Sequence, residues 1–533
     1  MRVTVTGRAR LGVGLLVGAA LLAAGCGSVK PAAAQTQSAT TTDPKAAQPS
    51  GSWPYPNGDL ANTRDATGST ISSANVPQLQ QAWTFRLTGK HTGVAGVGSL
   101  TMSPVVVSGV VYIQDMQANV YALDLATGKL RWEYQVNTPE LGGPGPDGVA
   151  VADGRVYGDA AHTVFALSAA TGKPVWVDRH LLTTGQGAFD IQPQAAAGRV
   201  YLASSLGNGT GGGILLALAA ATGKVLWKFN TILGSDTAVQ ADQVGAGGAW
   251  ETPLVGSDGS VTFGTGNPYE SPATAIAHPA RLLYSDSAVN LDAATGILRW
   301  YYQAVPNDFM DHDLQTSPIA TTINGTSAII DAGKMGYVYA INAQNGALLW
   351  KTPVGKHNGN DNDGLLALEH KLHVTAPLTV EPGALGGVLS NPAVAGDTVY
   401  VSTVDEPIIY TQLTQILGGK AVGTPTGEIE ALNLATGAVE WDTKLPEMAL
   451  GAATVSNDLV FSTLYGGELI ALNSATGAIV YRHQLPTTTN APLVVAGNTV
   501  IVSAGGPLTG KLVSGKAEVT GGGKPQIVAY TVP

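Results

Sequence analysis

A short pattern recurs along this chain and constrains its fold more than any other feature. Each copy begins with an apolar stretch, passes through a Thr-Gly or Asn-Gly pair and ends on an aromatic residue. The Gly supplies the positive φ that a tight hairpin demands, so each copy predicts two antiparallel strands joined by a turn. The seven copies are ALDLATGKLRW (122–132), ALSAATGKPVW (166–176), ALAAATGKVLW (217–227), NLDAATGILRW (290–300), AINAQNGALLW (340–350), ALNLATGAVEW (431–441) and ALNSATGAIVY (471–481).

Further strand patterns precede most copies, as in GRVYGDAAHTVF (154–165), so each unit predicts a four-stranded antiparallel sheet. The closing aromatics lie from 40 residues apart (Trp441 to Tyr481) to 91 (Trp350 to Trp441). The short spacings match a propeller blade of roughly 40–50 residues, and the long ones leave room for loop insertions. The sequence therefore predicts an all-β fold, a β-propeller. A two-sheet sandwich does not explain the regular recurrence of a Thr-Gly turn followed by a closing aromatic residue.

The blade count follows from the two ends of the repeat region. Trp83 is an eighth closing aromatic, in QLQQAWTF, and no repeat strands precede it. At the other end, APLVVAGNTVIVSAGG (491–506) and PQIVAYTVP (525–533) supply strands that no closing Trp follows. Joining them predicts eight four-stranded blades, with the N- and C-terminal strands sharing one blade. The ring is then closed and has no free sheet edge.

The N-terminus has the pattern of a targeting segment. Three Arg residues precede LGVGLLVGAALLAA (11–24), which is too short to span a bilayer but fits a signal-peptide core. Cys26, the only cysteine, follows after Gly25 and resembles the lipid-modified Cys of a bacterial lipobox; the alternative is an ordinary cleavable signal. We expect a lipoprotein signal peptide at 1–25, a lipid anchor with a disordered linker at 26–52, and the propeller domain at 53–533.

Composition excludes several classes of partner and cofactor. The formal net charge is −10 and no basic run is present, which argues against nucleic acid as a partner. A single Cys excludes an intramolecular disulfide and a covalent c-type haem, which needs C-x-x-C-H.

One loop concentrates acids in a chain of which only 12% is charged. PNDFMDHDLQ (306–315) holds Asp308, Asp311 and Asp313 within six positions. Three such acids can form a solvated turn, an acid–base pair or a cation site, and carboxylates with an Asn carbonyl suit a hard cation. Strand order places this loop on the face opposite the Thr-Gly turns, together with GNPYE (266–270) and GKMG (333–336). That face is the expected site.

Segments outside the repeat carry a more specific resemblance. Together with the repeat, they resemble the pyrroloquinoline quinone (PQQ) propeller enzymes, the quinoprotein alcohol dehydrogenases of the methanol, alcohol and glucose dehydrogenase type, over roughly residues 53–533. The matching segments are WPYPNGDLANTRDATGSTISSANVPQLQQAWTF (53–85), AWETPLVGSDGSVTFGTGNPYE (249–270), PNDFMDHDLQTSP (306–318), DAGKMGYVYAINAQNG (331–346) and PGALGGVLSNPAV (382–394).

The resemblance implies PQQ and a Ca²⁺ or lanthanide ion as cofactors. Carried over residue by residue, Asp311 is the general base and Asn267 is a ligand of the cation. Asp313 repeats an Asp-x-Asp arrangement found in some members, so Asp311 and Asp313 join Asn267 as metal candidates. The implied reaction transfers an alcohol proton to Asp311 while hydride passes to the quinone, whose carbonyl the cation polarises.

The same resemblance assigns residues to the quinone. Trp250 is the ring beneath it, Lys334 touches its oxygens and Asn391 lies nearby. Each also has a plain interpretation. Trp250 is then a core aromatic and Lys334 an exposed turn residue, while Asn267 before Pro merely starts a turn. Their common position on one face favours the site.

The chain departs from the family pattern in three respects. The metal-binding Glu of the family falls near SSLGNGTGGG (204–213), which offers Asn208 and no acid; Glu251 and Asp313 are possible substitutes. The vicinal cysteine pair of many members is absent, and so is a cytochrome domain. Electrons are therefore expected to leave for an external acceptor.

Two functions remain open from the sequence. The first is PQQ- and metal-dependent oxidation of an alcohol or sugar hydroxyl at the outer face of the cytoplasmic membrane, reached through the lipid anchor only. The second is a non-catalytic propeller lipoprotein that acts as a binding or assembly scaffold. The acids, Asn267 and Lys334 favour the enzyme, whereas the missing Glu favours the scaffold or a degenerate enzyme.

Overall fold

The computed structural model describes residues 48, 51–88, 99–136, 148–183, 185–205, 212–232, 247–416, 419–505, 512–513, 516–517 and 524–533. The predicted signal peptide, Cys26, most of the predicted linker and Asn208 lie outside these residues. The chain divides into two compact units, Met1–Thr41 and Thr42–Pro533, and every described residue belongs to the second. The described part contains no helix long and apolar enough to cross a membrane.

The described part of the second unit consists almost entirely of antiparallel sheets, and in most of them the strands pair in chain order. The first four are β2 (Val105–Val107), β3 (Val110–Gln114), β4 (Val120–Asp124) and β5 (Leu130–Tyr134); β6 (Ala150–Ala152), β7 (Arg155–Ala160), β8 (Thr163–Ser168) and β9 (Pro174–Asp178); β11 (Gln194–Ala196), β12 (Arg199–Ser205), β13 (Ile214–Ala219) and β14 (Val225–Asn230), with β10 (Ala188–Phe189) also on β12; and β15 (Leu254–Val255), β16 (Ser260–Gly264), β17 (Ser287–Asp292) and β18 (Leu298–Gln303).

Three more sheets of the same kind come next, and a further sheet joins the two ends of the unit. They are β19 (Ile319–Ile323), β20 (Thr326–Gly333), β21 (Tyr337–Asn342) and β22 (Leu348–Pro353); β24 (Ala393–Ala395), β25 (Thr398–Asp405), β28 (Thr426–Asn433) and β29 (Val439–Leu445); β30 (Thr454–Ser456), β31 (Leu459–Thr463), β32 (Glu468–Asn473) and β33 (Ile479–Gln484); and β34 (Val494–Ala496), β35 (Thr499–Ala504), β38 (Gln526–Thr531) and β1 (Gln80–Arg86).

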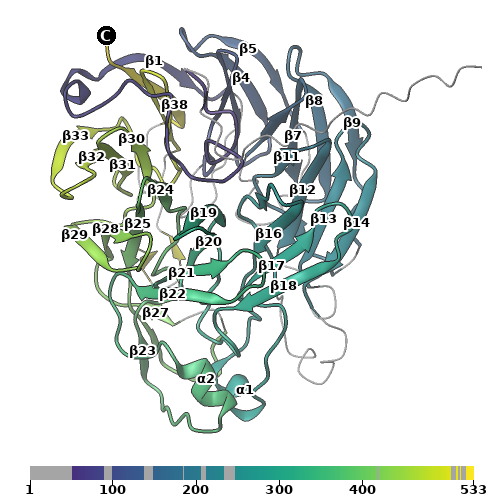
Figure 1. Cartoon of the computed structure of the whole chain (residues 1–533), viewed down its shortest axis with the longest axis vertical. Helices are drawn as coiled ribbons and strands as arrows, with labels where there is room; N and C mark the ends of the chain where they lie inside the picture. Colours follow the sequence, from purple (N-terminus) through teal and green to yellow (C-terminus); the bar gives the residue numbers. More distant parts are fainter. Residues whose placement is uncertain are drawn as a thin grey trace, which may run out of the picture. The chain divides into compact units, whose positions relative to one another are not determined.

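Short elements fill the connections. They are η1 (Val76–Gln78), α1 (Pro272–Ala277), α2 (Asp363–Leu368), a small sheet of β23 (Leu378–Val380), β26 (Ile408–Tyr410) and β27 (Lys420–Ala421), and the pair β36 (Leu512–Val513) and β37 (Lys516–Ala517). Figure 1 shows the four-stranded sheets following one another around a centre in chain order. The prediction of an all-β, propeller-like fold of four-stranded antiparallel blades is confirmed.

The repeat pattern exists because each closing Trp packs on the turn of the next sheet. Trp227, at the end of one copy, donates its indole N–H to the carbonyl of Ala293 in the next turn, at 3.1 Å. Its ring also covers that turn, since a Cβ on Gly296 would lie 2.6 Å from it. The same donor–turn bond is made by Trp83, Trp132, Trp176, Trp300, Trp350 and Trp441. The Thr-Gly pair and the Trp therefore form one contact that links successive sheets.

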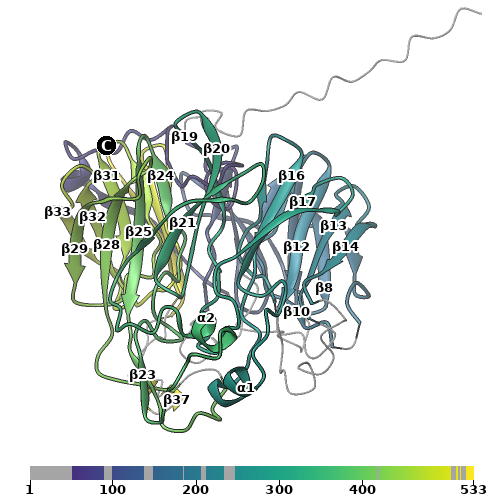
Figure 2. The same ribbon diagram turned by 60° about the horizontal axis from the view of Figure 1, so that its bottom comes forward.

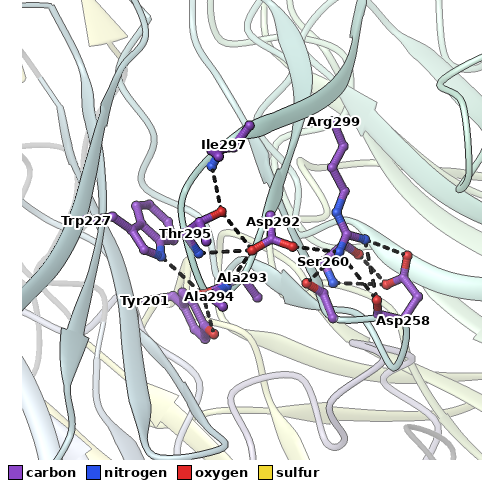
Figure 3. A network of polar contacts seen from close by, with 11 residues as sticks. Tyr201, Trp227, Asp258, Ser260, Asp292, Ala293, Ala294, Thr295, Ile297 and Arg299 are labelled. Carbon is purple, nitrogen blue, oxygen red and sulfur yellow. Dashed lines mark hydrogen bonds and ion pairs between the residues drawn. The ribbon is translucent and has the colours of Figure 1, made fainter. Parts of the chain in front are cut away.

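Figure 3 shows how one such turn is held from within. Asp292 accepts hydrogen bonds from the backbone N–H groups of Ala294 and Thr295 and from the Thr295 hydroxyl, at 2.8 to 3.1 Å. Arg299 on the following strand reaches Asp292 at 3.0 Å and Asp258 at 3.1 Å. An Asp or Asn before the turn thus stabilises the hairpin, because its side-chain oxygen accepts hydrogen bonds from backbone N–H groups of the turn residues.

The segment before β1 is anchored by a buried arginine. Arg64, with none of its surface exposed, donates to the carbonyls of Ala453 and Leu493 and to the side chains of Asn57, Ser103 and Thr454. These partners come from the segment itself and from several sheets. A buried charge is tolerated because its donors are bonded.

Two residues of the predicted linker belong to the folded unit. Gln48 is buried and donates from its side chain to the carbonyl of Asp65 at 3.1 Å, and Ser52 is also buried. The folded body therefore includes contacts from residues before Trp53.

The strand order places the site loops as expected. GNPYE joins β16 to β17, GKMG joins β20 to β21, and the acidic loop joins β18 to β19. All three connections leave the sheets at the end opposite the Thr-Gly turns. Near this end, α1 contacts α2, and Figure 2 shows both helices beside the ends of the sheets.

Candidate functional site

The acidic loop between β18 and β19 is buried. Asp308 and Asp313 each expose 1% of their surface, and the Asp311 side chain exposes 12%. The interpretation as a solvated turn is therefore wrong. Asp308 has a structural role, since it accepts hydrogen bonds from the backbone N–H groups of Met310 at 3.0 Å and His312 at 2.9 Å.

A lysine joins the other two acids. The Lys334 ammonium lies 3.0 Å from Asp311 Oδ2 and 2.5 Å from Asp313 Oδ2. Lys334 is itself buried, so it is not the exposed turn residue of the plain interpretation. Burial raises the pKa of both carboxyls, and the ammonium opposes that rise. The two acids raise the pKa of Lys334 against the effect of its burial, so the lysine stays charged.

Asp311 adopts a backbone conformation that few residues other than Gly adopt. Its φ is +65°, in the left-handed region. Such conformations persist only where the surroundings impose them, and they gather at functional sites. Here the flanking residues impose it, because Asp308 holds the loop on one side and Asp313 is bonded on the other.

Asn267 brings a further oxygen to this group. Its backbone N–H donates to Asp313 Oδ1 at 2.7 Å. Its side-chain Oδ1 is buried and has no hydrogen-bond partner among the described residues. A buried carbonyl oxygen without a donor is costly unless another group binds it. Asn267 Oδ1, Asp311 and Asp313 together form the donor set that a hard cation prefers.

Trp250 lies against the same group. A Cβ on Gly266 would fall 2.6 Å from both the Trp250 ring and Asp313 Oδ1, so ring and carboxylate meet at this glycine. Trp250 remains partly exposed, unlike a core aromatic. A flat ring beside these oxygens can support a planar ligand.

Asn391 lies in a network that continues to the buried arginine. Its side-chain amide donates to Glu251 Oε2 at 3.1 Å and to Asn57 Oδ1 at 3.2 Å, and its Oδ1 accepts from the Ser317 N–H. Asn57 in turn accepts from Arg64. Burial raises the pKa of Glu251 to about 7, an effect that the bond from Asn391 opposes.

The structure therefore brings Asn267, Asp311, Asp313, Lys334 and Trp250 together. Asn391 makes no recorded hydrogen bond to this group among the described residues; its side-chain amide donates to Glu251 instead. Glu251, one candidate substitute for the missing Glu, already accepts bonds from Asn391 and Ser317 through one oxygen. Asp313, the other candidate substitute, lies within the acid–lysine group.

Sequence reasoning missed several buried groups near the site. The charges of Asp311 and Asp313 act on Tyr269, and burial is the main cause of its raised pKa. Asp286 is fully buried, and neither oxygen of its carboxyl has a hydrogen-bond partner among the described residues. Asp190 has a pKa raised by burial to about 7, and its charge acts on Tyr269 and Glu251. The available signal was an acid next to an apolar strand, as in AFDIQ and YSDSAV.

Fold and site together define a class: a propeller with a buried acid–lysine group, an orphaned carbonyl oxygen and an aromatic ring at one end. Comparisons with known proteins identify the family. The profile of the glucose/ethanol/alcohol dehydrogenase β-propeller domain, a PQQ family, matches residues 53–359, more than half of the chain. The chain belongs to this family. A second profile, that of the outer membrane protein assembly factor BamB, matches residues 422–520.

Curated relatives agree with the family. The chain is 27% identical over 336 residues to a lupanine 17-hydroxylase [cytochrome c] of a Pseudomonas species, covering 56% of this chain and 47% of that protein. It is 27% identical over 353 residues to a quinohemoprotein alcohol dehydrogenase of Comamonas testosteroni, covering 58% and 48%. The chain thus spans about half the length of these relatives.

Among solved structures, a europium-containing methanol dehydrogenase has a similar fold. Its TM-score is 0.73 at 19% identity, and the superposition covers 92% of this chain and 99% of that one. At this identity the likeness concerns the fold.

Proposed function

We propose that this protein is a PQQ- and metal-dependent dehydrogenase that oxidises an alcohol or a sugar hydroxyl. The observation that carries the proposal is the group of Asn267, Asp311, Asp313 and Lys334 beside Trp250, in which three loops and the segment before β15 meet. Membership of the PQQ dehydrogenase family supports it, as does the similarity to a quinohemoprotein alcohol dehydrogenase.

The residues present fit the two cofactors. Asn267 Oδ1 and the carboxylates of Asp311 and Asp313 would hold a Ca²⁺ or lanthanide ion, and a cation satisfies the buried oxygen of Asn267. Trp250 would lie against the face of the quinone, and Lys334 would donate to its oxygens. When bound, PQQ accepts two electrons and the cation polarises one of its carbonyls.

The chain's own residues then position and deprotonate the substrate. Asp311 takes up the hydroxyl proton as a general base, and the Lys334 ammonium at 3.0 Å favours its ionised form. Asp308 fixes the loop on which Asp311 stands. The buried position of the acids excludes bulk water, which strengthens both interactions. The chain carries no C-x-x-C-H motif, so we propose that a separate protein or small molecule accepts the electrons.

Reconstitution tests the proposal directly. Purified protein is mixed with PQQ and either Ca²⁺ or a lanthanide. Quinone absorbance and dye-linked oxidation are then recorded across alcohols and aldoses. Saturable PQQ binding with metal-dependent turnover is expected. Absence of saturable quinone binding with every metal would contradict the enzyme and leave the scaffold as the alternative.

We also propose that the propeller has eight blades and a closed ring. The pairing of β1 with β38, which runs from Gln80 opposite Thr531 to Arg86 opposite Gln526, supports closure by the two ends of the unit. The antiparallel sheet β1-β38-β35-β34, which combines strands from both ends of the unit, is then the eighth blade.

We further propose that the protein is anchored by lipid on Cys26 at the outer face of the cytoplasmic membrane, by the lipobox resemblance alone. Labelled fatty acid should mark the wild-type protein and not Cys26→Ser. Equal labelling of both would contradict the anchor.

A further inference from the structure

A second group of acids lies outside the candidate active site, on strands β28 and β29. Glu430 is directly opposite Asp442 in the antiparallel pair, and Glu428 stands two residues earlier on the same face. One carboxylate oxygen from each of the three lies within 4.8 Å of the others. Glu428 and Glu430 are buried, at 1% and 4% exposure. Three carboxylates at this separation can bind one cation.

An orphaned hydroxyl points to the same place. Thr403 on β25 is directly opposite Glu428, so the two side chains share a face of the sheet. Thr403 is fully buried, and its Oγ1 has no hydrogen-bond partner among the described residues. Glu428 Oε1 is likewise buried without one. Thr403 Oγ1 and Glu428 Oε1 are thus two buried oxygens without a hydrogen-bond donor, and they lie beside further carboxylates. A bound cation explains this arrangement.

The group of acids lies where two neighbouring sheets meet. The backbone N–H of Gly355, just after β22, donates to Glu430 Oε1 at 2.7 Å. A Cβ on Gly355 would lie 3.3 Å from Thr403 Oγ1, so the loop after β22 covers the group. Below it, Val354, Val399 and Leu432 form one apolar cluster. Figure 1 shows β22 and the β25-β28-β29 sheet as neighbours.

The local charge is unbalanced. Asp405, on the same face as Thr403, adds a fourth carboxylate, which Lys356 contacts at 3.0 Å. Lys444 contacts Glu428 at 2.5 Å and Asp442 at 2.7 Å. When all four carboxyls are ionised, two ammonium groups leave two formal negative charges. Both lysine side chains are more than half exposed, at 51% and 63%, and are free to turn into solvent.

We propose that Glu428, Glu430, Asp442 and the Thr403 hydroxyl form a binding site for a Ca²⁺-class divalent cation. The site shares no residue with the proposed active site. All the proposed ligands are oxygens, and Asp442 is exposed, so water can complete the coordination. Such a site suits Ca²⁺ and not Zn²⁺. The ion displaces the Lys444 ammonium from Glu428 and holds the loop after β22 against β28 and β29.

Calcium binding to the metal-stripped, full-length protein tests the site. Equilibrium dialysis with Ca²⁺ should give one ion fewer per chain for the double variant Glu428→Gln/Asp442→Asn than for the wild type. The control Glu440→Gln/Asp397→Asn removes the same formal charge from exposed acids on the same sheet and should keep the wild-type stoichiometry. Equal stoichiometry for the pocket variant and the wild type would overturn the proposal.

Two single variants keep the test valid if the double variant does not fold. Thr403→Val keeps the shape of the side chain and should weaken this Ca²⁺ affinity roughly tenfold by removing one ligand. Lys444→Ala removes the internal competitor and should strengthen it roughly tenfold. If the acids serve only to hold Lys444, its removal will destabilise the protein and no tighter calcium binding will appear, which overturns the proposal.

Discussion

At the scale of single residues, Lys334 determines what the candidate site can do. Its ammonium lies between Asp311 and Asp313, two acids that would otherwise repel each other in a buried position. Without an opposite charge, burial would keep at least one of them protonated. The lysine therefore opposes the rise in pKa that burial causes in both acids and favours their ionised forms.

The first prediction concerns Asp311. Asp311→Asn should remove oxidation and leave the fold and most quinone binding intact, because Asn keeps an oxygen and tolerates the left-handed backbone. Loss of a general base typically costs 10²–10⁴-fold, or about 3–5 kcal/mol of barrier. The measurement is dye-linked turnover next to quinone absorbance. Wild-type turnover by this variant would mean that the acids form a structural cation site only.

The second prediction concerns Asp286. Burial raises its pKa well above the ordinary value, and the charges of Asp308 and Asp313 raise it further. Because the folded-state pKa lies above the unfolded one of about 4, stability is retained at acidic pH and falls as the pH rises toward the folded pKa. Asp286→Asn cannot ionise and accepts the positive φ at this position. Its advantage in Tm over the metal-free wild type should therefore grow from pH 4 to pH 8.

The exposed acid Asp397 provides the control for that measurement. Asp397→Asn should follow the wild-type dependence of Tm on pH. A Tm difference between Asp286→Asn and the wild type that stays constant with pH would show that Asp286 is ionised throughout.

At the scale of elements, the contact between a closing Trp and the next turn repeats from sheet to sheet. Trp176 donates to the Ala220 carbonyl at 3.0 Å, and a Cβ on Gly223 would lie 2.7 Å from its ring. The glycine is therefore required twice, by its φ of +74° and by the close approach of the ring.

A matched pair of glycines separates these two requirements, which is the third prediction. Gly198 has nearly the same φ, +73°, but nothing within 4 Å of an added Cβ. Gly198→Ala should cost about 1–2 kcal/mol for the left-handed backbone alone. Gly223→Ala should cost a further 1–3 kcal/mol, roughly the usual penalty of overpacking. Urea unfolding of both variants measures the difference, and equal costs would mean that the Trp ring moves aside freely.

The repeat was readable from the sequence because its information is local. A turn, two strands and a closing Trp lie within about a dozen residues, and the loops on the site face follow from strand order. Contacts between residues far apart in the sequence could not be predicted in the same way. The burial of Asp308, the network from Arg64 through Asn57 to Asn391, and the approach of Thr403 to Glu428 all depend on packing between segments far apart in the chain.

At the scale of the whole propeller unit, β1 near its beginning and β38 at its end pair in one sheet. β38 lies between β35 and β1 and pairs with both along its length. Its residues Ile527, Val528 and Ala529 are fully buried. The last ten residues thus supply a central strand, and β1 depends on them for its only partner in the sheet.

The last prediction is that removal of residues 524–533 abolishes cooperative folding. Burial of Ile527 and Val528 alone is worth about 1.5–3 kcal/mol each, and the loss of two strand ladders adds to that. The sum approaches the 5–15 kcal/mol, roughly, by which a typical domain is stable. Deletion of residues 27–47 is the control, because it stops short of Gln48 and its bond to Asp65. Thermal unfolding should show a sharp transition for the control and none for the C-terminal truncation. A truncated protein that melts like the wild type would mean that the remaining sheets hold together without the strand shared between the two ends, and closure of the ring would then contribute nothing to stability.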